Sequence, residues 1–295
     1  MPMEDSPTDT RRSQMIDRAL LIQRIDAAIA EDFVGNVDVT SLPIIPSTQR
    51  AIGEFRTRRS GVVSGIDIAI LVLDRVCKGG YEVRSRISDG NIVGKDVSVL
   101  KVTALTRELL VAERTALNFL SRLSGISTAT HTWVSAISGT SAKIRDTRKT
   151  TPGWRDLEKY AVVKGGGVNH RLNLAESALI KDNHIAAVGS ITAAVRAIKA
   201  QFPEILIEVE IDHLEQLEEA ITAGADEVLL DNMSPEQCAL AVKINNSRVR
   251  LEASGGISLE TVRAYAQTGV DFIAVGAITH SAPILDIGLD ITEVF

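Results

Sequence analysis

The strongest constraint on the fold is a regular alternation of short apolar runs and amphipathic segments in the last third of the chain. Two of the amphipathic segments open at Ser234-Pro235 and Ser258, residue types that favour helix starts. Such alternation is typical of parallel strands joined by right-handed crossovers. We interpret the strands as apolar throughout and favour a (β/α) barrel over an open doubly wound sheet. The predicted strands span 205–211, 227–230, 249–253 and 271–275, and the predicted helices span 214–223, 235–244 and 258–267.

The first half of the chain has a mixed pattern that predicts a separate α/β module. In the helix expected over 106–123, one face is apolar (Leu109, Ala112, Ala116, Leu120, Leu123) and the other is polar (Arg114, Asn118, Ser121, Arg122). Glu113 falls inside the apolar arc, where a lone carboxylate is costly. The other expected helices span 19–33 and 66–76, and the expected strands span 51–63, 81–87, 97–104 and 142–144. We therefore expect a disordered tail over 1–14, a first domain over 15–123, the barrel over 124–282 and a terminal segment over 283–295 that returns to the first domain.

Composition excludes several classes of protein. The 295 residues carry 32 Lys and Arg against 38 Asp and Glu, a net charge of −6, which argues against nucleic acid as a partner. Cys77 and Cys238 show no metal-binding spacing. The aliphatic run at 68–73 is far shorter than the ~20 residues of a membrane helix. The first 14 residues contain no apolar signal-like stretch. We expect a reduced, cytoplasmic protein with no membrane partner.

Basic side chains gather at the predicted C-terminal ends of the strands, which form the active site of a barrel. Arginine binds carboxylates in a bidentate manner and lysine supports phosphate as a point charge, so the pattern predicts an anion pocket. A solvated run of charge is the plainer alternative, although such runs more naturally follow helix faces. The residues are Arg145, Arg148, Lys149, His170, Arg171, Lys181 and His184.

Acidic and glycine-rich strand ends complete the predicted site. Glu210 and Asp231 end neighbouring strands and could hold Mg²⁺ together with substrate phosphates. Ser254-Gly255-Gly256, with bare backbone N–H groups before the helix expected at Ser258, is a candidate phosphate cradle, and Val275-Gly276-Ala277 ends the next strand. Their plainer alternatives are helix caps for the carboxylates and an ordinary turn for the glycines. Among the lone histidines, we retain only His170 and His280 as site candidates.

Six ordered motifs resemble one enzyme family, the carboxylating nicotinate-nucleotide pyrophosphorylases, also called quinolinate phosphoribosyltransferases. The resemblance extends from about residue 19 to the C-terminus. Asn173 and Glu176 depart from the family pattern, which commonly has Gly and Asp there, and could change the loop geometry. The motifs are Ala112–Asn118, Asp146–Gly153, Gly165–Arg171, Leu179–His184, Ser254–Ile257 and Val275–Ser281.

The resemblance implies the reaction of quinolinate with phosphoribosyl pyrophosphate (PRPP) to give nicotinate mononucleotide, CO₂ and pyrophosphate. It implies an N-terminal α/β sandwich, an incomplete TIM-like (β/α) barrel and a homodimer in which Arg114 enters the partner's site, with assembly into hexamers left open. The implied quinolinate ligands are Arg114, Arg148, His170, Arg171 and Lys181. Lys149 would contact the phosphoribosyl group, Thr147 is a further expected substrate contact, and Glu210 and Asp231 would hold the ribose and Mg²⁺-pyrophosphate. The 5′-phosphate would contact Ser254, Gly255, Gly276 and His280, and the further expected substrate contacts are Gly256, Val275 and Ala277.

Lys149, Lys181, Glu210 and Asp231 are the expected catalytic residues. Two alternatives stay open at this point. A related phosphoribosyltransferase that does not decarboxylate would need fewer basic groups than Arg114, Arg148, Arg171 and Lys181 supply together. A non-catalytic barrel that binds an anionic metabolite would be expected to lack the acidic pair or the lysine, and both are present.

Overall fold

A computed structural model describes residues 16–295 and divides them into two compact units. The first unit contains the described residues up to Thr128 together with Asp156–Lys164 and Pro283–Phe295, and the second contains Ala129–Arg155 and Gly165–Ala282. Residues 156–164 therefore group with the first unit, although the sequence pattern placed them in the barrel. The tail expected over 1–14 lies outside the described residues.

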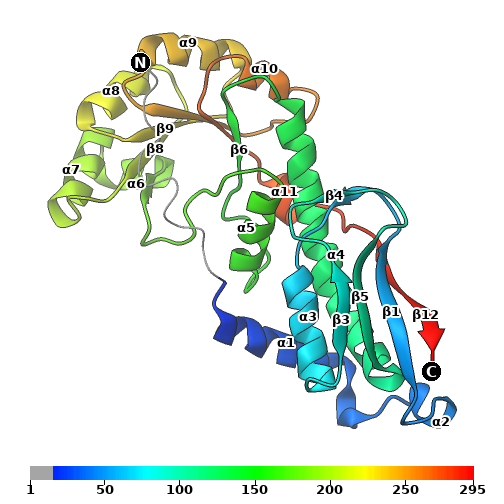
Figure 1. The fold of residues 1–295 in the computed structure, drawn as a ribbon. Coiled ribbons are helices and arrows are strands. Elements are labelled where there is room, and N and C mark those ends of the chain that lie inside the picture. Colours follow the sequence, from blue (N-terminus) through cyan, green and yellow to red (C-terminus); the bar gives the residue numbers. More distant parts are fainter. Residues whose placement is uncertain (1–15) are drawn as a thin grey trace. The chain divides into compact units, whose positions relative to one another are not determined.

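The first unit is built on a four-stranded antiparallel sheet in the order β12-β1-β5-β3 (Figure 1). The last strand of the chain pairs with β1, so the C-terminal residues complete this sheet. The strand expected over 51–63 is wrong as a single element, because the polar stretch at 58–60 leaves the sheet and a short second ladder, β2 with β4, follows. The strands are β1 (Arg50–Thr57), β2 (Gly61–Val62), β3 (Glu82–Arg86), β4 (Ile92–Val93), β5 (Ser98–Leu105) and β12 (Ile287–Val294).

Helix α4 (Thr106–Ala136) is much longer than the expected 106–123. Ser124-Gly125 resembles a helix end, but a Cβ at Gly125 would collide with the backbone of Pro283 and Ile284, so this glycine permits close packing. All five residues of the expected apolar face are buried. Ser121, expected on the polar face, is also buried, and its carbonyl accepts a hydrogen bond from Leu285 N at 3.0 Å. The remaining helices of this part of the chain are α1 (Arg18–Asp32), the 3₁₀ turn η1 (Val34–Asn36), α2 (Ser41–Ile44), α3 (Ile66–Cys77) and α5 (Arg155–Lys164).

The second unit is an open, barrel-like parallel sheet in the order β6-β11-β10-β9-β8-β7, which confirms the incomplete barrel. Strands β6 and β11, the first and last of this sheet in chain order, are neighbours as they are in a barrel, and Val168 adds one bridge beside Arg145. No ladder between described residues joins β6 to β7. The strands are β6 (Lys143–Arg145), β7 (Ala178–Ile180), β8 (Ile207–Ile211), β9 (Glu227–Asp231), β10 (Arg250–Ser254) and β11 (Phe272–Ala274).

Helices α7 to α10 line the outer side of this sheet (Figure 1). Helix α9 begins where the sequence predicts, with Ser234 and Gln237 forming a capping box and Pro235 in the first turn. Helix α10 begins at Val262, four residues later than expected, because residues 259–261 form turns. The helices are α6 (Asp182–Val188), α7 (Ile191–Gln201), α8 (Glu215–Ala223), α9 (Pro235–Asn245), α10 (Val262–Ala266) and α11 (Ala277–His280).

The inner face of the barrel strands is charged, so the expectation of strands that are apolar throughout is wrong. Glu208 on β8 is in register with Glu227 on β9, which is in register with Arg250 on β10. Side chains two residues apart on a strand point to the same face of the sheet. Glu210 therefore lies on the same face as Glu208, and Glu252 lies on the same face as Arg250. Among the described helices, none combines the length and apolar character needed to cross a membrane.

Candidate active site

The predicted site residues, apart from Arg114, lie in the second unit at or near the C-terminal ends of its strands. Asp231 and Ser254 are register partners at the ends of β9 and β10. Glu210 is in register with Leu229, which shares a face with Asp231, so the two carboxylates lie on the same side of neighbouring strands. Arg114 belongs to the first unit, where it is exposed on α4.

Two guanidinium groups are poised for an anion. Arg148 follows β6, and Arg171 follows the segment that bridges to β6; both are half-buried. The Nε atom of each is buried and has no hydrogen-bond partner. Burial and the nearby charge of Arg148 lower the pKa of Arg171. Like charges held together with unsatisfied donors are unfavourable unless an anion binds between them, so this pair indicates a carboxylate-binding pocket.

An acidic pair with a lysine lies at the ends of β7, β8 and β9. Lys181, directly after β7, forms an ion pair with Oε2 of Glu210. Asp231 accepts a hydrogen bond from Asn232 Nδ2 at 2.7 Å through Oδ2. Oε1 of Glu210 and Oδ1 of Asp231 are not used in these bonds. The oxygen donors on one face fit a hard cation such as Mg²⁺, which prefers carboxylates together with phosphate oxygens.

Glycine backbone forms the rest of this edge. Gly255 has φ of +92°, and a Cβ there would overlap the side chain of Asn232. Gly256 also has positive φ but faces open space. A Cβ built on Gly276 would lie 3.2 Å from Lys149 Cδ and 3.3 Å from His280 Nε2, so both side chains pack against this glycine. Because α10 begins only at Val262, bare peptide groups form the candidate cradle without the helix dipole that the sequence suggested.

The neighbouring predicted residues have varied exposure and contacts. Val275 is buried, and its N–H donates to Arg145 O at 2.9 Å, whereas Ala277 is exposed. Thr147 Oγ1 accepts a hydrogen bond from Lys149 N at 3.1 Å, which shapes the turn after β6. His184 Nδ1 accepts from Lys181 N at 3.0 Å and caps α6.

A buried charge cluster lies below the strand ends. Arg145 Nη1 donates to Glu227 Oε2 at 2.8 Å and to Glu252 Oε2 at 2.7 Å, and the guanidinium stacks on the ring of Phe272 at 3.5 Å. Burial raises the pKa of Glu252 to about 7, with the charge of Glu208 adding to the effect. Burial and the charge of Glu227 likewise raise the pKa of Glu208 to about 7. For Glu227 burial acts in the same direction, but Arg145 and Arg250 act against it and its pKa is lowered.

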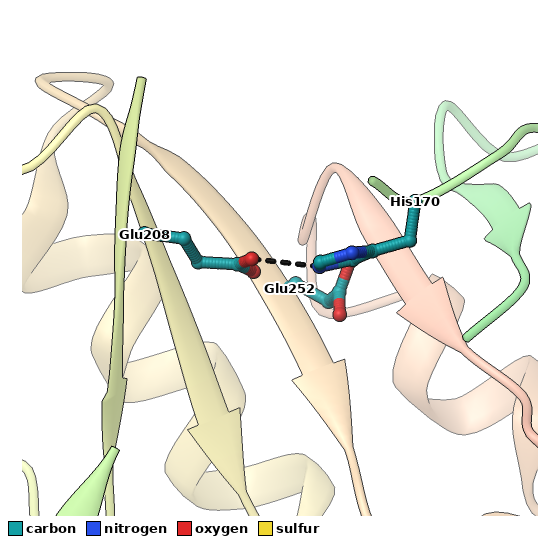
Figure 2. A group of neighbouring side chains, drawn as sticks. All are labelled: His170, Glu208 and Glu252. Atoms are coloured by element: carbon teal, nitrogen blue, oxygen red, sulfur yellow. Dashed lines mark hydrogen bonds and ion pairs between the residues drawn. The ribbon is translucent and has the colours of Figure 1, made fainter. Parts of the chain in front are cut away.

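His170 connects this cluster to the edge above it (Figure 2). Its Nε2 lies 2.7 Å from Glu208 Oε2, and its Nδ1 accepts a hydrogen bond from Arg171 N at 2.8 Å. Its own N–H donates to Asp146 Oδ1 at 2.8 Å. Both ring nitrogens are therefore engaged by protein atoms.

Sequence reasoning missed Asp146, Glu208 and Glu252 as contributors to this region. The signal was available in the alternation of Glu208 and Glu210, and of Glu252 and Ser254, along strands that otherwise read as buried. Charged residues at a spacing of two place several charges on one face of a sheet.

The two departures from the family pattern have local structural roles. Asn173 Oδ1 accepts a hydrogen bond from Ala175 N at 2.8 Å, which forms a tight turn, and its backbone is not in the left-handed region. Glu176 Oε2 accepts from Leu172 N at 2.6 Å. Elsewhere, Glu113 is half-buried, and burial raises its pKa while Arg114 opposes that shift.

Comparison with known proteins places these features in context. The family model of the quinolinate phosphoribosyl transferase C-terminal domain matches residues 126–290, and that of the N-terminal domain matches residues 38–124. A carboxylating nicotinate-nucleotide pyrophosphorylase of Mycobacterium leprae (strain TN) is 50% identical over 271 residues, or 90% of this chain and 95% of the relative.

Solved structures agree with this similarity. The nicotinate-nucleotide pyrophosphorylase of Francisella tularensis superposes with a TM-score of 0.90 at 37% identity, covering 94% of this chain and 98% of its own. That of Ehrlichia chaffeensis superposes with a TM-score of 0.87 at 41% identity, covering 92% and 98%. The similarity therefore covers almost the whole length of the chain in sequence and in fold.

Proposed function

Because this chain belongs to the quinolinate phosphoribosyltransferase family, we propose that it transfers the phosphoribosyl group of PRPP to quinolinate with loss of CO₂. The products are nicotinate mononucleotide and pyrophosphate, which makes the chain a pentosyltransferase of NAD biosynthesis. The observation that carries the proposal is the pair of half-buried guanidiniums, Arg148 and Arg171, whose buried Nε atoms have no partner. Quinolinate is a pyridine dicarboxylate and supplies the anionic oxygens that this pair needs.

The remaining groups at the strand ends fall into two sets, one for each substrate. Lys181 follows β7 and assists Arg148 and Arg171 in binding the carboxylates. Lys149 packs against Gly276 and His280, which supports a role at the phosphoribosyl group and its 5′-phosphate. Ser254, Gly255 and Gly256 offer backbone donors for the same phosphate, as do Gly276 and Ala277.

Glu210 and Asp231 are the proposed ligands of Mg²⁺. Each has one carboxylate oxygen that the ion pair or hydrogen bond described above does not use. The residues present therefore fit a cation that also takes oxygens from the pyrophosphate group of PRPP. When bound, Mg²⁺ would offset the negative charge of the pyrophosphate leaving group.

The chemistry requires positioning and electrostatic stabilisation more than covalent catalysis. The bond between C1 of the ribose and the pyrophosphate oxygen breaks, and the ring nitrogen of quinolinate forms a bond to C1. Glu210 and Asp231 stabilise the positive character that develops on the sugar. The C2 carboxylate then leaves as CO₂, its bonding electrons remain on C2 beside the positively charged ring nitrogen, and C2 takes up a proton.

We also propose that two copies of the chain form a homodimer in which Arg114 completes the quinolinate pocket of the partner. Its exposed position on α4 supports this role, because an exposed arginine is available to another chain. Location in the cytoplasm stays a prediction from the sequence.

A direct assay tests the proposal. Purified protein receives quinolinate, PRPP and Mg²⁺, and nicotinate mononucleotide and CO₂ are both quantified, with nicotinate replacing quinolinate in a parallel reaction. We expect product from quinolinate only, with one CO₂ per nucleotide. Product from nicotinate alone would identify a transferase that does not decarboxylate, and tight quinolinate binding without turnover would identify a binding protein.

A further inference from the structure

The ring of His170 is held in one protonation form by its two neighbours. A backbone N–H can only donate, so the 2.8 Å contact from Arg171 N requires Nδ1 to be the acceptor. In the neutral ring Nε2 then carries the proton and donates a hydrogen bond to Glu208 Oε2 at 2.7 Å. Figure 2 shows the ring edge directed toward this carboxylate, with Glu252 close to the same edge.

The chain of contacts runs from a sheet strand to a substrate-facing loop. Glu208 is the second residue of β8 and is 5% exposed, so the sheet fixes its position. His170 transmits that position to the backbone of Arg171. The guanidinium of Arg171 is fixed in turn through Nη1, which donates to Ser177 O at 2.8 Å. The opposite side of the loop is held by Asp146, which accepts from Asn169 Nδ2 at 2.6 Å.

We propose that Glu208 is a positioning residue of the quinolinate pocket, acting through the ring of His170 to hold Arg171 in the orientation that binds a substrate carboxylate. The inference rests on the proposed function and deepens it. It assigns His170 an indirect role instead of the direct carboxylate contact expected from the sequence, because neither ring nitrogen has a lone pair or proton left for substrate.

A metal site is the main alternative for these side chains. Ligand atoms of His170, Glu208 and Glu252 lie within 4.8 Å of one another. However, Arg145 already donates to Glu252 Oε2 at 2.7 Å, and His170 Nε2 donates a hydrogen bond to Glu208. A divalent cation would have to displace the proton and face a guanidinium, so the cluster is better balanced as a hydrogen-bonded network than as a metal centre.

Three variants separate the hydrogen bond from charge and from general stability. Glu208→Leu removes the acceptor, Glu208→Gln retains an acceptor oxygen without charge, and Glu227→Gln alters a carboxylate of the same cluster that bonds Arg145 and Arg250 instead. We expect Glu208→Leu to raise KM for quinolinate about tenfold, as loss of a buried hydrogen bond implies. Glu208→Gln should restore KM to within about threefold of wild type, and KM for PRPP should change by less than about threefold in all variants.

Glu227→Gln is the matched control for loosening of the cluster. It should lower the melting temperature yet leave KM for quinolinate within about twofold of wild type. Equal effects of Glu208→Leu on both KM values, or an effect of Glu227→Gln on quinolinate as large as that of Glu208→Leu, would overturn the inference. An unchanged KM for quinolinate in a folded Glu208→Leu variant would overturn it as well.

Nuclear magnetic resonance of the wild-type protein provides a second measurement that needs no variant at Glu208. In chain labelled with ¹⁵N-histidine, the His170 ring is assigned through its proximity to the Arg171 amide. We expect a protonated Nε2 and an unprotonated Nδ1 at neutral pH. A ring protonated at Nδ1 would contradict the inference, whereas a wild-type chain without turnover of quinolinate would contradict the proposed function. The two failures are therefore distinguishable.

Discussion

Arg148 is the residue whose side chain is best placed to bind an anion. Its buried Nε has no hydrogen-bond partner, and its charge lowers the pKa of the nearby Arg171. Replacing it by lysine keeps the charge but removes the planar fork that binds a carboxylate through two hydrogen bonds. We expect Arg148→Lys to raise KM for quinolinate roughly tenfold to a hundredfold, since hydrogen bonds between charged groups contribute about 1.5–3 kcal/mol. Steady-state kinetics with each substrate varied in turn measures this effect.

The same substitution at Arg248 is the control for Arg148→Lys. Arg248 forms an exposed ion pair with Glu218 at 2.7 Å, and such pairs contribute little to stability. Arg248→Lys should leave both KM values within about twofold of wild type. If Arg148→Lys behaves like Arg248→Lys, Arg148 does not bind quinolinate.

At this scale the sequence predicted which residues gather at the edge but not how they bond. Strand ends can be counted in a sequence, which is why Arg148, Lys181 and Glu210 could be grouped in advance. The bonds of His170 to Glu208 and to the backbone of Arg171 depend on a loop conformation that no periodicity encodes. Its indirect role was for that reason out of reach of the sequence.

Among the elements, the turn after β10 makes the most specific demand on its sequence. Gly255 combines φ of +92° with a position where a Cβ would overlap Asn232 and lie 3.0 Å from its backbone nitrogen. We expect Gly255→Ala to raise KM for PRPP at least several-fold, because the peptide groups that face the phosphate must move, and to leave KM for quinolinate nearly unchanged. A loss of roughly 1–3 kcal/mol in unfolding free energy should accompany it.

Substitution of Gly189, at the C-terminal end of α6, is a control that introduces the same backbone strain as Gly255→Ala without a steric clash. Gly189 has φ of +95°, and a Cβ there would meet no atom within 4 Å. Gly189→Ala should therefore cost a similar conformational strain with no change in either KM. Equal kinetic effects of the two alanine variants would show that the Gly255 turn has no special role in phosphate binding.

Helix boundaries show where element prediction fails. The start of α9 followed from its capping box and proline, which are local signals. The end of α4 and the start of α10 did not, because Gly125 serves close packing against Pro283 and Ile284 and residues 259–261 close into turns. Packing between segments distant in the chain is invisible to a local pattern.

For the molecule as a whole, the charged interior of the barrel-like sheet couples stability to pH. Arg145 offsets only part of the negative charge of Glu208, Glu227 and Glu252, so protons compete with the guanidinium for the buried carboxylates. The sequence predicted the sheet and its parallel strands but not this charged layer, because the strands were interpreted as apolar. Buried charges must be paired or neutralised, and both solutions occur here within one cluster.

Glu252 allows this coupling to be measured. Burial, together with the charge of Glu208, raises its folded pKa to about 7, above the ordinary pKa of 4.5 that a glutamate has in an unfolded chain. Between these values the folded state binds more protons than the unfolded state, so the contribution of Glu252 to stability is present at low pH and is lost as the pH rises through 7. Glu252→Gln removes this titration. From pH 5 to pH 8, the unfolding free energy of the variant relative to wild type should rise by on the order of 2 kcal/mol.

Urea unfolding of wild type and Glu252→Gln at several pH values measures this change in unfolding free energy. Glu227→Gln is the control, because the pKa of Glu227 is shifted in the opposite direction. Burial tends to raise the pKa of Glu227, but Arg145 and Arg250 act against it and the net pKa is lowered. Its stabilising effect is therefore already present above the unfolded pKa and is lost only as the pH falls further. From pH 5.5 to pH 8 the difference between Glu227→Gln and wild type should change less than that of Glu252→Gln, because the loss of Glu227 removes only one of the causes that raise the pKa of Glu208. A constant difference for Glu252→Gln over the same range would mean that Glu252 stays ionised in the folded protein, held by Arg145 alone.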